Sequence, residues 1–117
     1  MRNSANGIIS LNLNTQFKKL YRSGLSTVTP SVVLYAKENG RSDNRVGITV
    51  SKKIGKAVVR NRAKRRLREV YRTNLPNIKS GYDFVLVARG RTATVPHLRL
   101  NTDFLQALKT LGVFNDE

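Results

Sequence analysis

The chain has 117 residues, with 22 lysines and arginines against seven acidic residues and a formal net charge of +15. It contains no cysteine, which excludes disulfides and cysteine-ligated zinc fingers, and no apolar run reaches the ~18 residues of a membrane span. A charge excess of this size repels itself unless a polyanion neutralises it, and nucleic acid is the commonest such partner. We therefore expect a single cytoplasmic nucleic-acid-binding domain over residues 1–117, with residues 1–13 loosely ordered and no membrane contact.

A short amphipathic helix is expected near the N-terminus. Phe17, Leu20 and Tyr21 are spaced at i, i+3 and i+4, which places them on one face of a helix. Asn14 belongs to the residue types that cap helix N-termini, and Gly24 to those that end helices. The sequence therefore predicts a helix between Asn14 and Gly24.

Two segments with strand character follow this helix. Residues 32–37 (VVLYAK) are rich in β-branched side chains, and residues 45–51 (RVGITVS) carry apolar side chains at alternate positions. Residues 38–44 between them have the composition of a turn, so we expect the two strands to form a hairpin. We also expect a short extra strand near Val28.

The second half of the chain predicts a helix, a buried strand and a final helix. The first helix is expected over residues 57–72, and the apolar run at residues 84–89 is typical of a strand buried on both faces. Asn101 or Thr102 is expected to begin the last helix and Gly112 to end it, with a buried stripe made by Phe104, Leu105, Leu108 and Leu111. The order predicts an α+β sandwich, with helices packed on one mixed sheet.

The stretch KIGKAVVRNRAKRRLREVYR, residues 53–72, holds nine basic residues and one acid, Glu69. On a helical wheel, one face carries a core-facing stripe of Val59, Ala63, Leu67, Val70 and Tyr71. Beside it runs a basic ridge of Arg60, Lys64, Arg68 and Arg72, with Asn61 and Arg65 on its outer side and Arg62 and Arg66 toward the opposite flank. Like charges at i, i+4 destabilise a helix by a few tenths of a kcal/mol, so solvated faces usually mix both signs. The ridge therefore favours binding to a polyanion.

The stretch GITVSKKIGKAVVRNRAKRRLREVYR resembles the signature region of the protein subunit of bacterial ribonuclease P, centred on its Arg-Asn-Arg motif. The resemblance continues into NTQFKKLYRSG and YDFVLVAR, and covers roughly residues 11–110. It implies a two-layer α-β-β-β-α-β-α fold with a left-handed crossover. It also implies that the partners are the catalytic RNA subunit and precursor tRNA, whose 5′ leader is removed in a reaction dependent on Mg²⁺ that the RNA mainly holds.

The resemblance also implies which residues contact RNA. The basic motif and the pair ahead of it match Lys52, Lys53, Arg60, Asn61, Arg62, Lys64, Arg65 and Arg68, and the same basic run adds Lys56, Arg66 and Arg72. Phe17, Tyr21 and Tyr35 match the aromatic positions of a cleft in which the leader lies. From the residues alone these aromatics are either core side chains or a stacking platform for single-stranded RNA.

No independent catalytic or metal site is expected, and no small-molecule substrate. The seven acids are scattered, whereas a two-metal nuclease needs carboxylates converging on one site. His97 follows Pro96 in an expected loop, where a solvent-exposed bystander is the simpler interpretation. Two alternatives stay open: a ribosomal or other structural RNA-binding protein without a processing role, and a helix-turn-helix DNA-binding protein, although a strand rather than a second helix precedes the basic helix.

Overall fold

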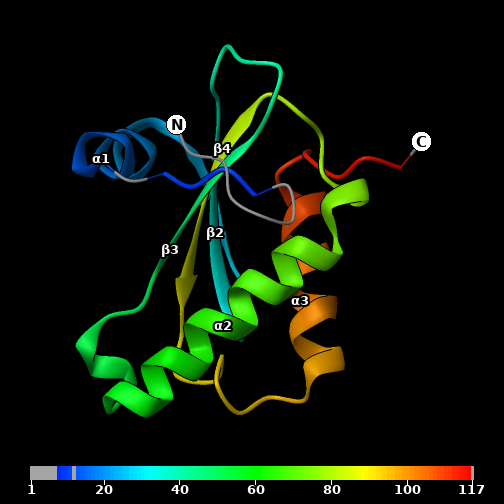
Figure 1. The fold of residues 1–117 in the computed structure, drawn as a ribbon. Helices are drawn as coiled ribbons and strands as arrows, with labels where there is room; N and C mark the ends of the chain where they lie inside the picture. The colour runs from blue at the N-terminus through cyan, green and yellow to red at the C-terminus, as the bar shows by residue number, and fades with distance from the viewer. Residues whose placement is uncertain (1–7, 12, 117) are drawn as a thin grey trace.

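The computed structural model describes residues 8–11 and 13–116. Within them, the α-helices are α1 (Asn14–Ser23), α2 (Ala57–Thr73) and α3 (His97–Thr110), and the strands are β1 (Leu25–Val28), β2 (Val32–Glu38), β3 (Arg45–Thr49) and β4 (Tyr82–Ala88). Two single 3₁₀ turns, Lys52–Ile54 and Leu75–Asn77, flank α2. The α-β-β-β-α-β-α order, including the short strand near Val28, is confirmed (Figure 1).

The four strands form one mixed sheet in the order β1-β2-β4-β3. β4 is antiparallel to β2 and parallel to β3. The predicted hairpin between residues 32–37 and 45–51 is therefore wrong, because β4 lies between those two strands. β2 instead forms an antiparallel hairpin with β1, and the continuous apolar run of β4 reflects its place inside the sheet.

The connection from β3 through α2 to β4 is a crossover between adjacent parallel strands. In Figure 1 both strands point down, α2 lies in front of the sheet and β4 lies to the right of β3. The crossover is therefore left-handed, as the family resemblance implied and against the general preference for the right-handed form.

The main core lies between one face of the sheet and the helices α2 and α3. Phe84 and Leu86 of β4 point into it and are fully buried, together with Leu67 of α2 and Phe104 of α3. The predicted stripe of α2 is confirmed, since its members are buried or packed against this core. Burial of these side chains holds α2 on the sheet and leaves its cationic face outward.

The opposite face of the sheet is partly covered by α1, which the expected two-layer arrangement did not include. Leu20 of α1 and Leu11 are buried there against Val85 of β4. Residues 8–11 are also tied to the edge of β3, since the Val46 N–H donates to the Ile9 carbonyl and the Leu11 N–H donates to the Val46 carbonyl, both at 2.9 Å. Loose order over residues 1–13 thus does not describe residues 8–11, whereas residues 1–7 and 12 lie outside the described chain.

Two helix boundaries differ from the expected ones. The N-cap of α1 is Leu13 rather than Asn14, and its backbone N–H donates to the Gln16 side chain at 3.1 Å, which satisfies one of the free donors of the helix end. The last helix begins at His97, four residues before the earliest expected start, directly after Pro96. Proline lacks the N–H that a helix start leaves unpaired, so Pro96 marks the start of this helix rather than the loop that the sequence predicted.

Candidate nucleic-acid interface

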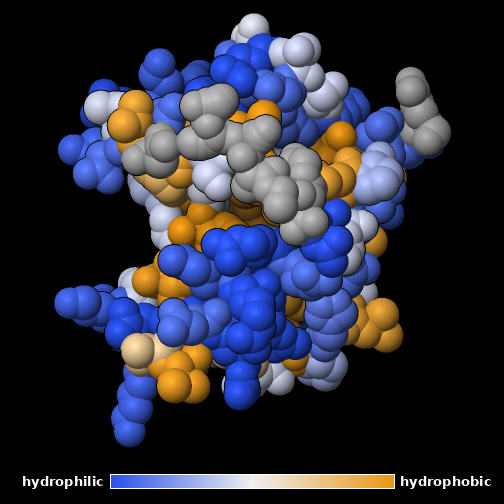
Figure 2. Space-filling view, in the orientation of Figure 1, coloured by the Kyte–Doolittle hydropathy of each residue, from blue (hydrophilic) through white to orange (hydrophobic). Residues whose placement is uncertain are grey.

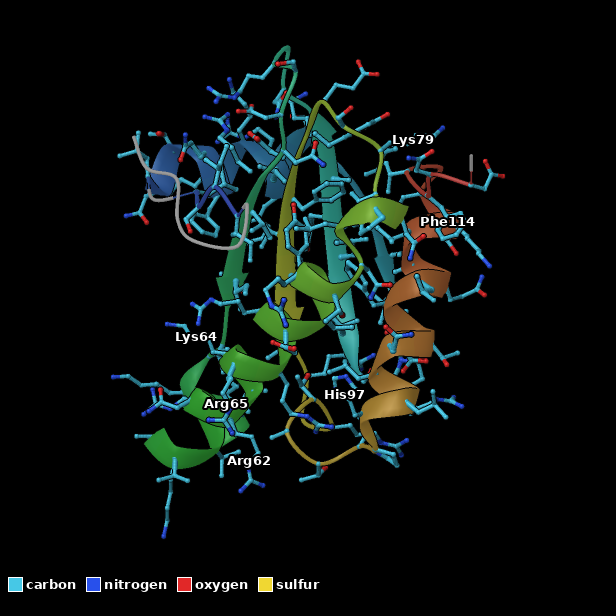
Figure 3. All side chains as sticks on the ribbon, turned by 45° about the vertical axis from the view of Figure 1, so that its right-hand side comes forward. Arg62, Lys64, Arg65, Lys79, His97 and Phe114 are labelled. Atoms are coloured by element: carbon cyan, nitrogen blue, oxygen red, sulfur yellow. The ribbon has the colours of Figure 1, made fainter. Side chains whose placement is uncertain are left out.

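The outward face of α2 forms a cationic surface. The predicted contact residues that are exposed on the helix are Asn61, Arg62, Lys64, Arg65 and Arg68. Figure 3 shows three of them projecting from α2 away from the sheet, and Figure 2 shows hydrophilic side chains gathered over the helix. Arginine provides a planar fork of donors that suits phosphate oxygens.

The two ends of the basic ridge are engaged within the protein, and its middle is not. The Arg72 guanidinium is paired with Glu69, the sole acid of α2, at 2.6 Å. The Arg60 Nε donates to the Gly55 carbonyl at 3.1 Å. Among the described residues, Lys64 and Arg68 have no such ion pair, so the middle of the ridge is the part that offers unneutralised charge.

The approach to α2 adds three exposed lysines. Lys52 and Lys53 lie in the 3₁₀ turn after β3, and Lys56 is the N-cap of α2. Gly55 between them has φ +149°, in the region that favours glycine, and this turn redirects the chain from the sheet into the helix. The positive end of the helix dipole therefore coincides with three cations and no acid in the first turn, which raises the local affinity for anions.

Arg66 differs from the other cations of α2. Its two terminal nitrogens donate to the carbonyls of Thr92, at 2.8 Å, and Val95. The guanidinium thus holds the segment between β4 and α3 against α2. The structure gives Arg66 protein partners where an RNA contact was expected.

A cleft lies between α2 and the N-terminal part of the chain. Its lining includes Phe17 of α1 and Gly47 of β3 on one side and Lys64 and Arg68 on the other. The Phe17 ring lies directly over Gly47, where an added Cβ would come within 2.4 Å of the ring carbons Cε1 and Cζ. Figure 2 shows apolar residues in the band between α1 and α2. Cationic and aromatic groups therefore face the same hollow.

Tyr21 and Tyr35 lie further along the same face of the sheet. Their rings meet edge to face with centroids 4.9 Å apart, so α1 and β2 jointly position them. Tyr21 is 44% exposed and Tyr35 is half-buried, with Phe17 and Tyr35 packed against the small cluster under α1. The three aromatics are thus neither wholly core nor wholly free, and each leaves part of its ring accessible to a base.

Tyr71 of α2 lines the inner side of the cleft. Its burial, chiefly, and the charge of Asp83, to a smaller degree, raise the pKa of its phenol well above the usual value. A phenol is protonated at neutral pH in any case, and the shift extends this to more alkaline solution, so Tyr71 adds no negative charge to the cleft.

Three other features of the described chain bear on the site. No three of its His, Asp and Glu side chains come together as metal ligands do. His97 is exposed at the first position of α3 rather than in a loop (Figure 3). The sequence reasoning also missed the exposed cations of α1, Lys18, Lys19 and Arg22, although the acid-free run FKKLYR carried that signal.

A mixed sheet, a helix with one neutralised acid and many cations, and an aromatic cleft beside that helix define an RNA-binding α+β protein. The family model for ribonuclease P matches residues 8–112. The ribonuclease P protein component of Natranaerobius thermophilus is 44% identical over 102 residues, which are 87% of this chain and 89% of that protein. The component of Alkaliphilus oremlandii is 40% identical over 105 residues, which are 90% and 92% of the two chains.

Solved structures match as well. The Staphylococcus aureus RNase P protein has a TM-score of 0.80 at 32% identity, covering 91% of this chain and 97% of that one. The Thermotoga maritima protein has a TM-score of 0.75 at 30% identity, covering 87% and 94%. The chain belongs to the bacterial ribonuclease P protein family, the protein subunits of a ribonucleoprotein endoribonuclease that processes tRNA. Within the described residues, no helix has the length and apolar character needed to cross a membrane.

Proposed function

We propose that this protein binds the catalytic RNA through the exposed cations of α2 and binds the 5′ leader of precursor tRNA in the cleft beside that helix. The observation that carries the proposal is the pairing of the two kinds of group in one hollow: Phe17 over Gly47 on one side, and the unpaired cations of the ridge on the other. We expect the protein to act in the cytoplasm, where its RNA partners are made.

The physical roles of the two surfaces differ. Each phosphate neutralised by a cation releases counterions, with a slope of log affinity against log salt of about −0.7 for single strands. Each base stacked on an aromatic ring adds about 1–3 kcal/mol with little dependence on sequence. The cations of α2 would therefore hold the RNA generally, while Phe17, Tyr21 and Tyr35 would favour an unpaired strand such as the leader.

Mg²⁺ is assigned to the RNA side of the complex. Among the described residues no three carboxylates come together as metal ligands do, and Glu69, Asp83 and Asp103 each pair with an arginine. Cations on α2 would lower the electrostatic repulsion between RNA and substrate, so that fewer diffusible Mg²⁺ ions are needed for binding.

Reconstitution tests the proposal. Catalytic RNA and precursor tRNA are mixed at low Mg²⁺ with and without the protein, and the rate of leader release is measured. We expect faster release with the protein, and an equal rate would overturn the proposal.

The cleft assignment is tested on the same complex by binding. Tyr21→Ala should weaken binding of precursor tRNA by about 1–3 kcal/mol, the loss of one stacked base, and leave mature tRNA unaffected. Leu98→Ala is the matched control, since Leu98 is an exposed large apolar side chain on α3, 77% exposed. Equal losses of affinity for precursor and mature tRNA would contradict the assignment of the leader to the cleft.

A further inference from the structure

The outer face of α1 is a second cationic surface, separate from α2. Lys18, Lys19 and Arg22 are exposed there, and none of them forms an ion pair with another described residue. Together with the hydroxyl residues Thr15 and Ser23 they line a shallow hollow. Every side chain around this hollow can donate hydrogen bonds and none carries negative charge, which is the composition that phosphate oxygens require.

Helix stability does not explain these three cations. Lys18 and Arg22 are spaced at i, i+4 and Lys19 and Arg22 at i, i+3, so each pair is repulsive, and α1 has no acid to compensate. Arg22 alone gains from the helix dipole, because it lies in the last turn. The helix is kept in place by Leu20 and Phe17 on its inner face. The outer charges are therefore free to serve a ligand.

The cationic face begins beside the aromatic cleft. At 100° per residue, Tyr21 lies about 40° around the helix from Phe17, Lys18 about 100° and Arg22 about 140°. A strand stacked on Tyr21 that leaves the cleft over α1 would meet Lys18 next and then Arg22.

The other flank of α1 is different in charge. A hollow there is lined by Lys19 and Lys37, but also by Glu38, Arg45 and Asp83. Arg45 and Asp83 neutralise each other with two bonds of 2.8 Å. Of the two hollows beside α1, only the one on the outer face is lined by cations without any acid.

We propose that the outer face of α1, through Lys18, Lys19 and Arg22, binds the phosphodiester backbone of the leader segment that extends beyond the cleft. This inference rests on the proposed function, since it takes the cleft as the place where the leader enters. It assigns a separate surface to the distal leader nucleotides, with contacts to phosphates only and therefore no preference for base sequence.

The experiment uses the holoenzyme with precursor tRNAs whose leaders are lengthened one nucleotide at a time. The test variant is Lys18→Gln with Arg22→Gln, in which glutamine keeps the helix propensity and removes two charges. The control is Lys79→Gln with Lys109→Gln, which removes two charges from exposed sites; Figure 3 places Lys79 on the side of the C-terminal segment, away from α1. Thermal unfolding of each variant verifies that it is folded.

The expected result is a leader-length dependence. The test variant should bind short-leader precursor like the parent and lose affinity once the leader is long enough to leave the cleft. For long leaders its slope of log affinity against log salt should be shallower by about 1.4, for two contacts at about 0.7 each. The control should follow the parent at every length.

Two results would overturn the inference. One is parent-like affinity of the test variant for every leader; the other is an equal loss at all lengths and with mature tRNA, which would assign the face to the catalytic RNA or the tRNA body. The parent protein distinguishes failure of this inference from failure of the proposed function. If the parent binds precursor tRNA no more tightly than mature tRNA, the proposal that the leader binds in the cleft is wrong, whatever the variant shows.

Discussion

At the scale of single residues, Arg65 and Arg66 are neighbours on α2 with opposite surroundings. Arg65 is exposed and projects into solvent, whereas Arg66 donates to two backbone carbonyls of the segment before α3. The helical wheel separated their flanks correctly, but it could not show that a loop some thirty residues away in the sequence supplies the partners of Arg66. The charge pattern of the sequence therefore does not distinguish exposed cations from a cation that has protein partners.

This difference gives a paired prediction. Arg66→Gln should lower the free energy of unfolding by about 1–3 kcal/mol, because two carbonyls lose a charged donor. Arg65→Gln should change it by less than about 0.5 kcal/mol, as for other surface substitutions. In RNA binding the order reverses, since only Arg65→Gln should flatten the salt dependence. Urea unfolding and binding titrations measure both effects, and equal behaviour of the two variants would contradict the assignment.

At the scale of elements, the sequence predicted which segments form helices and strands better than which strands are neighbours. The alternation in residues 45–51 and the turn before them favoured a hairpin, a local interaction. In the structure β4 lies between these two strands instead, because a strand that is apolar on both faces is most stable inside the sheet. The local sequence of β2 and β3 does not indicate that β4, which begins more than thirty residues after β3, pairs with both of them.

The contact between α1 and β3 supports a prediction at this scale. Gly47→Ala should destabilise the protein by about 1–3 kcal/mol through overpacking, because its Cβ would collide with the Phe17 ring. In the double variant with Phe17→Ala that collision is absent, so the total loss should fall short of the sum by about 0.5–3 kcal/mol. Urea unfolding of the two single variants and the double variant measures this coupling; strictly additive losses would show that the ring does not rest on Gly47.

At the scale of the whole molecule, the charge of +15 predicted the class of partner, and the Arg-Asn-Arg stretch predicted the family. The crossover hand followed only from the resemblance, because the general rule gives the opposite hand. The sequence predicted the α2 cations and the three aromatics as candidate site residues, but that Phe17 lines one hollow with Lys64 and Arg68 could be known only from the fold. The role of the α1 cations needed the fold as well, since a spacing alone does not tell which side of a helix adjoins a cleft.

The charge excess also predicts that salt acts in opposite directions on stability and on binding. Screening reduces the self-repulsion of the folded chain, so the melting temperature of the free protein should rise as potassium chloride is added. The same salt should weaken RNA binding, because the gain from counterion release falls. Thermal unfolding and binding titrations over one series of salt concentrations test this, and a falling melting temperature would show that ion pairs such as Arg45 with Asp83 outweigh the repulsion.

The central place of β4 also determines when the protein can fold as it is made. The ribosome synthesises β2, β3 and all of α2 before residues 82–88 exist, so β2 and β3 then lack the strand that joins them, and α2 lacks part of its packing surface. Contacts so distant along the chain form late and slowly. During that interval a strongly basic segment is already synthesised but has no complete sheet to pack on. For this chain, the charge that attracts RNA is therefore present before the fold that makes its binding specific.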